Sequence, residues 1–121
     1  MQKKTFSLLV FHGSARQGAI DAAAGFAQKL RIEAGCENFA VCYLRGVAPE
    51  LHDAIAETIN SGYQNIRLIP LFLLPGSHIT IDIPEIVKKF SVTHPEVKFA
   101  IADCLVNDQL FLEFVANSIK N

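Results

Sequence analysis

The sequence FSLLVFHGS, residues 6–14, indicates the fold class of this chain. Its first six residues form an apolar run, which is typical of a strand buried on both faces of a parallel sheet. The run ends in a glycine-containing turn, and Ser14 with Gln17 then predicts a capping box at the start of a helix. A buried strand that passes through a tight turn into a helix predicts an α/β domain.

The same succession of strand and helix continues to the end of the chain. Apolar runs and helical spacing predict these further elements: helix 15–34, strand 39–44, helix 49–61, strand 66–74, a helix from 82, strand 97–102 and a helix from 107. Pro70 cannot donate a ladder hydrogen bond, so we expect regular pairing in the third strand to stop there. The pattern predicts a central parallel sheet of about four strands, covered by helices on both faces through right-handed crossovers.

The last two predicted helices carry more detailed expectations. Asp82 and Glu85 have the spacing of a second capping pair, so we assign Asp82 a capping role. Apolar residues recur at helical spacing in the final helix and are expected to face the core: Leu110, Phe111, Phe114, Val115 and Ile119.

Length and composition allow one domain, residues 1–121, with its own apolar core. The chain has 121 residues and is 50% hydrophobic, which is enough to bury a core without disulfide or metal staples. Its formal net charge of -1 does not favour nucleic acid or anionic membranes as partners, and no apolar stretch approaches the roughly 18 residues of a membrane span. Three cysteines without a CxxC pair favour a reducing compartment. We therefore expect a soluble, cytoplasmic protein.

Two histidines follow predicted strands and are the leading candidates for a functional site. His12 comes directly after the first strand, and His78 lies in the loop after the third. Either residue alone is compatible with a packing or capping role. Because ligands bind at the carboxyl ends of the strands in open α/β sheets, the two together predict a shared pocket.

Two phosphate chemistries fit the first loop poorly. Gly13 and Gly18 have P-loop spacing, but Ala19 and Ile20 stand where Lys and Ser or Thr would bind phosphate and magnesium. Histidine phosphatases begin with a strand followed by Arg-His-Gly, and here Phe11 replaces that arginine, which removes the bidentate phosphate clamp. Neither nucleotide hydrolysis nor phosphatase activity is expected.

HGS after the first strand, followed by PLFLLPGSHITIDIP at residues 70–84, resembles the short form of the CbiX family of cobaltochelatases, which are similar to sirohydrochlorin ferrochelatases. The resemblance implies a chelatase-like three-layer fold and a lyase that inserts a divalent metal into sirohydrochlorin, in cobalamin or related tetrapyrrole biosynthesis. The metal is a substrate, with cobalt expected first and iron or nickel as alternatives, and no organic cofactor is implied. Long relatives contain two such lobes, so the resemblance also implies a homodimer that encloses the tetrapyrrole.

By the same resemblance, His12 and His78 are the catalytic and metal-binding pair. Metal insertion expels two protons from the pyrrole nitrogens, and neutral imidazole can hold the metal and accept protons near pH 7. We assign substrate binding to Ser14, Arg16 and Ser77, because Arg16 with the first helix's NH groups can anchor a sirohydrochlorin carboxylate. The alternative for Arg16 is a solvated helix residue.

The sequence departs from the family pattern at two places. Relatives usually carry an acid after the second strand, where this chain has Arg45, and a charged pair before DIP, where it has Thr80 and Ile81. If Arg45 points into the cleft, its positive charge disfavours an incoming divalent cation, so we expect weak metal uptake that Arg45→Glu improves. The alternatives are that Arg45 faces solvent or anchors a substrate carboxylate. The alternative function is therefore a non-catalytic protein that binds a tetrapyrrole or a metal in the same cleft.

Overall fold

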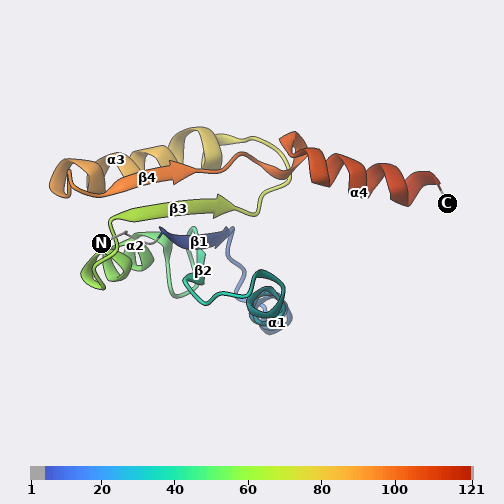
Figure 1. The fold of residues 1–121 in the computed structure, drawn as a ribbon, viewed down its shortest axis with the longest axis horizontal. Helices are drawn as coiled ribbons and strands as arrows, with labels where there is room; N and C mark the ends of the chain where they lie inside the picture. Colours follow the sequence, from blue (N-terminus) through green and yellow to red (C-terminus); the bar gives the residue numbers. More distant parts are fainter. Residues whose placement is uncertain (1–4, 121) are drawn as a thin grey trace.

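Four parallel strands form the centre of the computed structural model, which describes residues 5–120 (Figure 1). The strands are β1 (Thr5–Phe11), β2 (Phe39–Tyr43), β3 (Asn65–Pro70) and β4 (Lys98–Ile101). Their order across the sheet is β2-β1-β3-β4, and each neighbouring pair is parallel. The predicted parallel sheet of about four strands is therefore confirmed.

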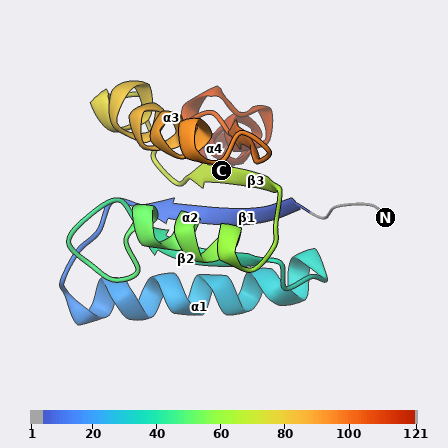
Figure 2. The ribbon, with the colours of Figure 1, turned by 90° about the vertical axis from the view of Figure 1, so that its left-hand side faces the viewer.

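Helices cover both faces of the sheet because strand side chains alternate between them. The helices are α1 (Gln17–Ala34), α2 (Leu51–Asn60), α3 (Ile83–Thr93) and α4 (Gln109–Lys120), with a π-helical turn, η1 (His78–Asp82), before α3 and a 3₁₀ turn, η2 (Leu105–Asn107), before α4. Leu8 and Val10 of β1 belong to the larger core cluster, which α2 and α3 cover. Leu9 faces the other way and packs with Ala27 of α1, which runs along β1 and β2 (Figure 2). Within residues 5–120, none of these helices combines the length and apolar character that a membrane crossing needs.

The backbone confirms one predicted element boundary and corrects another. β3 ends at Pro70, where the missing amide donor was expected to stop regular pairing. The predicted capping box is wrong, because α1 begins at Gln17 with Arg16 as its N-cap residue and no side chain caps it. The Ser14 hydroxyl oxygen instead accepts a hydrogen bond from the Arg16 amide at 3.3 Å, which closes a turn ahead of the helix.

The capping role assigned to Asp82 is also wrong. The chain is already helical from His78, since η1 runs into α3 without a break, and Asp82 has right-handed helical angles of φ -65 and ψ -49. Its side chain makes no capping hydrogen bond. A residue inside a continuous helical segment has no free helix start to cap, so this carboxylate is available to other partners.

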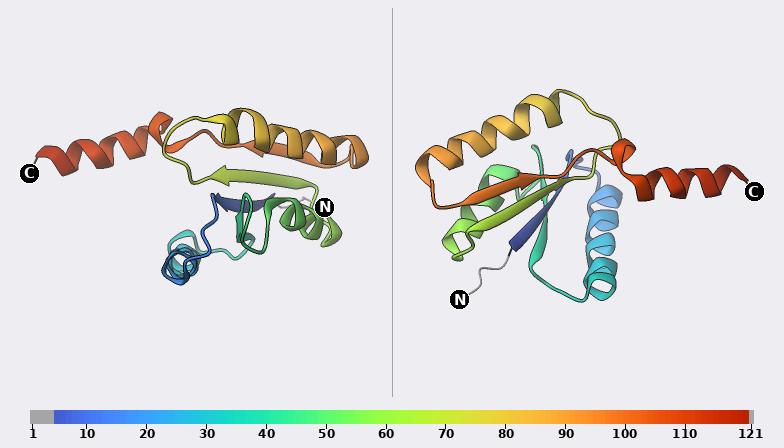
Figure 3. Two further views of the ribbon diagram at one scale, coloured as in Figure 1. Left: turned by 180° about the vertical axis from the view of Figure 1, so that it is seen from behind. Right: turned by 45° about the horizontal axis from the view of Figure 1, so that its top comes forward.

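The prediction that the last helix faces the core is wrong as well. Leu110, Phe114 and Ile119 of α4 are 75%, 64% and 79% exposed. The helix extends away from the sheet instead of returning to it, as Figures 1 and 3 show from several directions. Helical periodicity identifies an apolar face, but it does not say which surface covers that face. The fold otherwise has the expected layers, with α1 on one side of the sheet and α2 and α3 on the other.

Candidate metal centre

The structure brings His12 and His78 together at the carboxyl edge of the sheet. His12 directly follows the last residue of β1, and His78 opens η1 after the loop that follows β3. Because β1 and β3 are paired neighbours, both loops leave the sheet at the same edge. The two imidazole rings are 5.0 Å apart between centroids and nearly perpendicular, with an interplanar angle of 80°. This separation allows the two side chains to approach one small ligand together.

The ring of His12 is held by an aromatic neighbour. It packs on Phe72, with centroids 3.9 Å apart and planes tilted by 32°, and Phe72 is itself buried. Burial against its surroundings lowers the pKa of His12, and the nearby charge of His78 lowers that pKa further. Both effects favour the neutral form of His12, which has a nitrogen lone pair available to a metal or a proton.

The ring of His78 is oriented by a carboxylate. Its Nδ1 lies 2.8 Å from Oδ2 of Asp82, four residues further along the same helical segment. An ionised carboxylate can only accept hydrogen bonds, so Nδ1 of His78 carries the proton in this contact. In the neutral ring, the lone pair is then on Nε2. A hydrogen bond to one ring nitrogen commonly fixes the orientation and tautomer of metal-binding histidines in this way.

Arg45 is bound to the same carboxylate. Its Nη2 lies 3.1 Å from Oδ2 of Asp82, although the side chain is 67% exposed. The positive charge of Arg45 is thus paired with the negative charge of Asp82 beside His78, and this pairing offsets its effect on the two histidines. This ion pair reduces the repulsion expected between Arg45 and a cation in the cleft, and weak metal uptake stays a prediction.

Gly13 allows the His12 loop to pack against the backbone of Arg45. Gly13 has φ +111, and a Cβ at this position would collide with the carbonyl oxygen of Arg45. The Arg45 amide donates to the carbonyl oxygen of His12 at 3.4 Å, and the Leu44 amide donates to that of Phe11 at 2.8 Å. The glycine of HGS therefore has a steric role, since it keeps the end of β1 close to the end of β2.

A cavity of 390 Å³ opens beside His12 on the α1 side of the sheet edge. It is lined by Phe11, His12, Gly13, Ser14, Ala19, Ala22, Ala23, Phe26, Tyr43 and Leu71. Its size and its mostly apolar lining are those of a small-molecule site. Of the three residues predicted to bind substrate, Ser14 lines this cavity, whereas Arg16 and Ser77 are exposed and are not among its lining residues.

The candidate site contains few side chains of the types that bind metals. In the part of the chain that the structure describes, no group of three or more His, Cys, Asp and Glu side chains is placed to hold a metal ion. The remaining histidines belong elsewhere: His52 packs on Phe90 with centroids 5.0 Å apart, and His94 contacts the hydroxyl of Thr93. Among the four histidines, His12 and His78 are therefore the pair that the structure brings together at the sheet edge.

Sequence reasoning missed two residues of the site. The predicted strand 66–74 includes Phe72, whose contact with His12 depends on the loop path after Pro70. The capping role predicted for Asp82 hides its contact with His78, although the spacing of four residues indicates such a contact, because side chains four apart meet on a helix.

Comparisons with known proteins show the family to which this chain is related. A sequence model of the CbiX family matches residues 7–121. The chain is 26% identical over 113 residues to a sirohydrochlorin ferrochelatase from Priestia megaterium, which covers 93% of this chain and 42% of that protein. It is 39% identical over 46 residues to a sirohydrochlorin cobaltochelatase from Methanococcoides burtonii, which covers 38% of this chain and 35% of that protein.

Solved structures share the fold. The sirohydrochlorin chelatase SirB from Bacillus subtilis subspecies spizizenii, in complex with cobalt, superposes with a TM-score of 0.81 at 23% identity, over 97% of this chain and 50% of that chain. A CbiX protein from Marinobacter aquaeolei VT8 superposes with a TM-score of 0.79 at 20% identity, over 97% of this chain and 95% of that chain. The chain spans less than half the length of the two Bacillaceae ferrochelatases that it matches, at 42% and 44%. With the family model matched over almost its whole length, the chain belongs to the CbiX family.

Proposed function

We propose that this protein is a sirohydrochlorin chelatase that inserts a divalent metal, cobalt first, into the macrocycle. The observation that carries the proposal is the pair of imidazoles, His12 and His78, with centroids 5.0 Å apart at the edge of the sheet. His12 also lines a cavity of 390 Å³, and His78 is not among the residues that line it. The relatives named above include ferrochelatases and a cobaltochelatase, and SirB structures hold cobalt or iron, so iron is the alternative metal and nickel a third.

The residues suit each step of such a reaction. His12 and the Nε2 nitrogen of His78 would hold the incoming metal at one face of the macrocycle. As the metal passes to the four ring nitrogens, two pyrrole N–H protons must leave, and the freed imidazoles can accept them and pass them to water. Asp82 keeps His78 in the orientation that leaves Nε2 unprotonated. The products balance as metallated macrocycle and two protons.

Substrate binding follows from the charge of sirohydrochlorin, which carries several carboxylates. Ser14 lines the cavity beside His12, and we propose that Arg16 and Ser77, exposed on the two loops that carry the histidines, bind carboxylates around its rim. One lobe offers one wall to the macrocycle, so we also propose that a second copy supplies the other.

The experiment that tests the proposed function follows the visible absorption of sirohydrochlorin with cobalt, iron and nickel in turn. Parent protein should accelerate insertion of at least one metal over the uncatalysed rate, and His12→Ala or His78→Ala should lower the rate by about 100-fold or more. His52→Ala is the matched control, because His52 lies on α2 away from the site. Equal rates in the parent and both site variants would overturn the proposal.

A specific observation favours a second candidate function, a non-catalytic tetrapyrrole- or metal-binding protein. No group of three or more metal-ligating side chains is found among residues 5–120, and Arg45, paired with Asp82, stands where the family resemblance leads us to expect an acid. In that case sirohydrochlorin would bind and its absorption would shift, but the rate of metal insertion would equal that without protein.

A further inference from the structure

The guanidinium of Arg45 reaches the candidate metal centre and keeps most of its hydrogen-bonding capacity unused. Within residues 5–120, its side chain donates to Oδ2 of Asp82 at 3.1 Å and makes no second hydrogen bond. The Arg45 side chain is 67% exposed. Because a guanidinium has five N–H donors, most of the donors of Arg45 face solvent beside the histidines.

The backbone of Arg45 is fixed by the loop that carries His12. The Arg45 amide donates to the His12 carbonyl oxygen at 3.4 Å, and the Leu44 amide donates to the Phe11 carbonyl oxygen at 2.8 Å. Gly13 packs against the carbonyl oxygen of Arg45, where a Cβ would collide. The position of Arg45 relative to His12 is therefore defined, while its exposed side chain can change partners.

Asp82 does not depend on Arg45 for a hydrogen bond. Its Oδ2 atom also lies 2.8 Å from Nδ1 of His78, which is the shorter of its two contacts. An exposed ion pair with a single hydrogen bond contributes little to stability, because water solvates both charges well. A ligand that offers Arg45 a better acceptor can therefore displace Asp82, and His78 still holds the carboxylate in place.

A carboxylate is the acceptor that suits Arg45. The planar guanidinium can donate two parallel hydrogen bonds to one carboxylate, whereas Asp82 accepts only one from it. Sirohydrochlorin, the substrate proposed above, carries several carboxylates, so this inference rests on the proposed function. To receive a metal from His12 and His78, the macrocycle would have to lie over both rings, which brings its rim within reach of Arg45.

Arg45 also supplies a cation on the opposite side of the histidines from Arg16. Arg16 is the N-cap residue of α1, which covers one face of the sheet. Arg45 meets Asp82 at the end of η1, which continues into α3 on the other face. Because the carboxylates are spread around the rim of the macrocycle, cations on both sides can hold it over the two imidazoles.

We propose that Arg45 is a substrate-binding residue that exchanges Asp82 for a carboxylate of the macrocycle. In the free protein Asp82 neutralises the guanidinium, and in the complex the substrate does. Asp82 then keeps its bond to His78 with its negative charge no longer offset, which favours a divalent cation beside the imidazoles. Substrate binding and attraction of the metal are thereby coupled through one arginine.

Titration with metal-free sirohydrochlorin, followed by its visible absorption, tests the contact. Arg45→Met should weaken binding by about 10-fold or more, because a hydrogen-bonded charge pair with the substrate is lost. Arg45→Lys, which keeps the charge but loses the planar fork, should lie between the parent and Arg45→Met. Arg31→Met is the matched control, because it removes an arginine from the last turn of α1, at the far end of the helix from Arg16. It should bind as the parent does.

A neutral ligand distinguishes carboxylate recognition from a structural role of Arg45. The same macrocycle with its carboxylates converted to amides should bind the parent more weakly, and Arg45→Met should cause no further loss. If Arg45→Met weakens binding of the acid and the amide equally, Arg45 acts by holding its loop and the inference is wrong. If Arg45→Met binds sirohydrochlorin as the parent does, the inference also fails, but the proposed function stands. A parent that binds no sirohydrochlorin would overturn both.

Asp82→Asn tests the exchange of partners. It removes the charge that holds Arg45 in the free protein, so affinity for sirohydrochlorin should rise several-fold. The rise should be largely absent when Arg45→Met is also present, since no guanidinium is then released. Glu85→Gln, which removes an exposed acid of α3, measures the gain that comes only from one negative charge fewer near an anionic ligand. An equal gain from Asp82→Asn with and without Arg45 would overturn the exchange.

Discussion

The candidate site depends on how individual side chains orient two imidazoles. Phe72 holds one ring by stacking, and Asp82 holds the other through a hydrogen bond to Nδ1. Arg45 binds the same carboxylate and thereby limits its movement. The geometry of the candidate metal site therefore depends on these neighbouring side chains as much as on the histidines themselves.

Removing the carboxylate should weaken metal binding without removing a metal ligand. In Asp82→Ala, His78 loses the acceptor for its Nδ1 proton, so we expect cobalt affinity to fall about 10- to 100-fold. Nitrogen NMR of His78 should show a mixture of tautomers in place of one, a change that a purely structural role would not produce. Glu85→Ala, which removes an exposed acid from α3, is the control. Unchanged affinity and tautomer in Asp82→Ala would rule out the orienting role.

Replacing Gly13 by alanine, which adds a single carbon, should destabilise the protein. Alanine at φ +111 is strained and its Cβ would meet the Arg45 carbonyl oxygen, so Gly13→Ala should lower the free energy of unfolding by about 1 to 3 kcal/mol. Gly18 lies in α1 with open space around it, so Gly18→Ala should instead raise stability by about 0.5 to 1 kcal/mol. Urea unfolding of the two variants measures both, and a Gly13→Ala protein as stable as the parent would contradict the packing described here.

At the scale of elements, the buried Cys42 thiol of β2 should make the free energy of unfolding depend on pH. Burial raises the pKa of the Cys42 thiol from 9.0 to about 12. Between these values the unfolded chain releases the proton and the folded chain keeps it, so the free energy of unfolding should fall as pH rises above 9, by up to about 4 kcal/mol near pH 12. Cys42→Ala should reduce this slope, whereas substitution of the exposed Cys36 should not. Equal slopes in all three proteins would argue against a buried thiol.

The elements also show what the sequence can and cannot predict. Predominantly apolar runs identified β1 to β4, although Arg67 and Lys98 interrupt two of them, and Pro70 marked the end of β3, because these signals are local. The capping roles of Ser14 and Asp82 were wrong, because each oxygen has a local alternative partner: an amide two residues on, or a histidine one turn back. The inward face of α4 was wrong for a different reason, since its partner surface depends on where the chain runs after β4.

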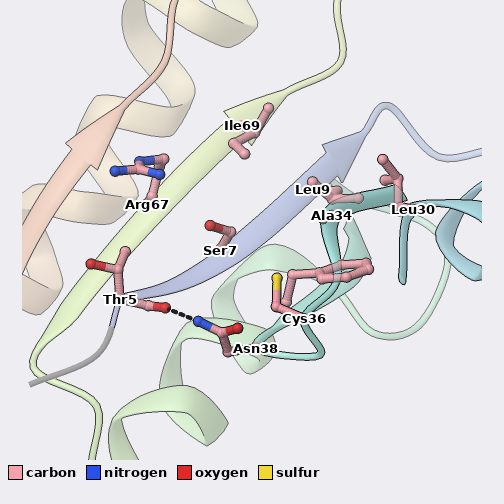
Figure 4. A pocket seen from close by; sticks show the side chains of 10 residues that line it. Thr5, Ser7, Leu9, Leu30, Ala34, Cys36, Asn38, Arg67 and Ile69 are labelled. Atoms are coloured by element: carbon pink, nitrogen blue, oxygen red, sulfur yellow. Dashed lines mark hydrogen bonds between the residues drawn. The ribbon is translucent and has the colours of Figure 1, made fainter. Parts of the chain in front are cut away.

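At the scale of the whole molecule, the lobe separates two surfaces. The two histidines and the cavity that His12 lines are at the carboxyl edge of the sheet, and a separate groove of 650 Å³ extends over the α1 face toward Thr5 and Asn38 at the amino ends of the strands (Figure 4). Substitutions far from the sheet edge should therefore leave metal binding unchanged. Phe114→Asp, on the exposed α4 outside the core clusters, should retain cobalt binding to His12 and His78.

Calorimetric titration with cobalt tests the central claim, that His12 and His78 together hold the metal. The parent should bind cobalt, each of His12→Ala and His78→Ala should abolish measurable binding, and His52→Ala should bind as the parent does. Thermal unfolding should show the site variants still folded, because both rings lie at the sheet edge and outside the core clusters. If a protein that carries both His12→Ala and His78→Ala binds cobalt as tightly as the parent, the metal is held elsewhere and the assignment of this site is wrong.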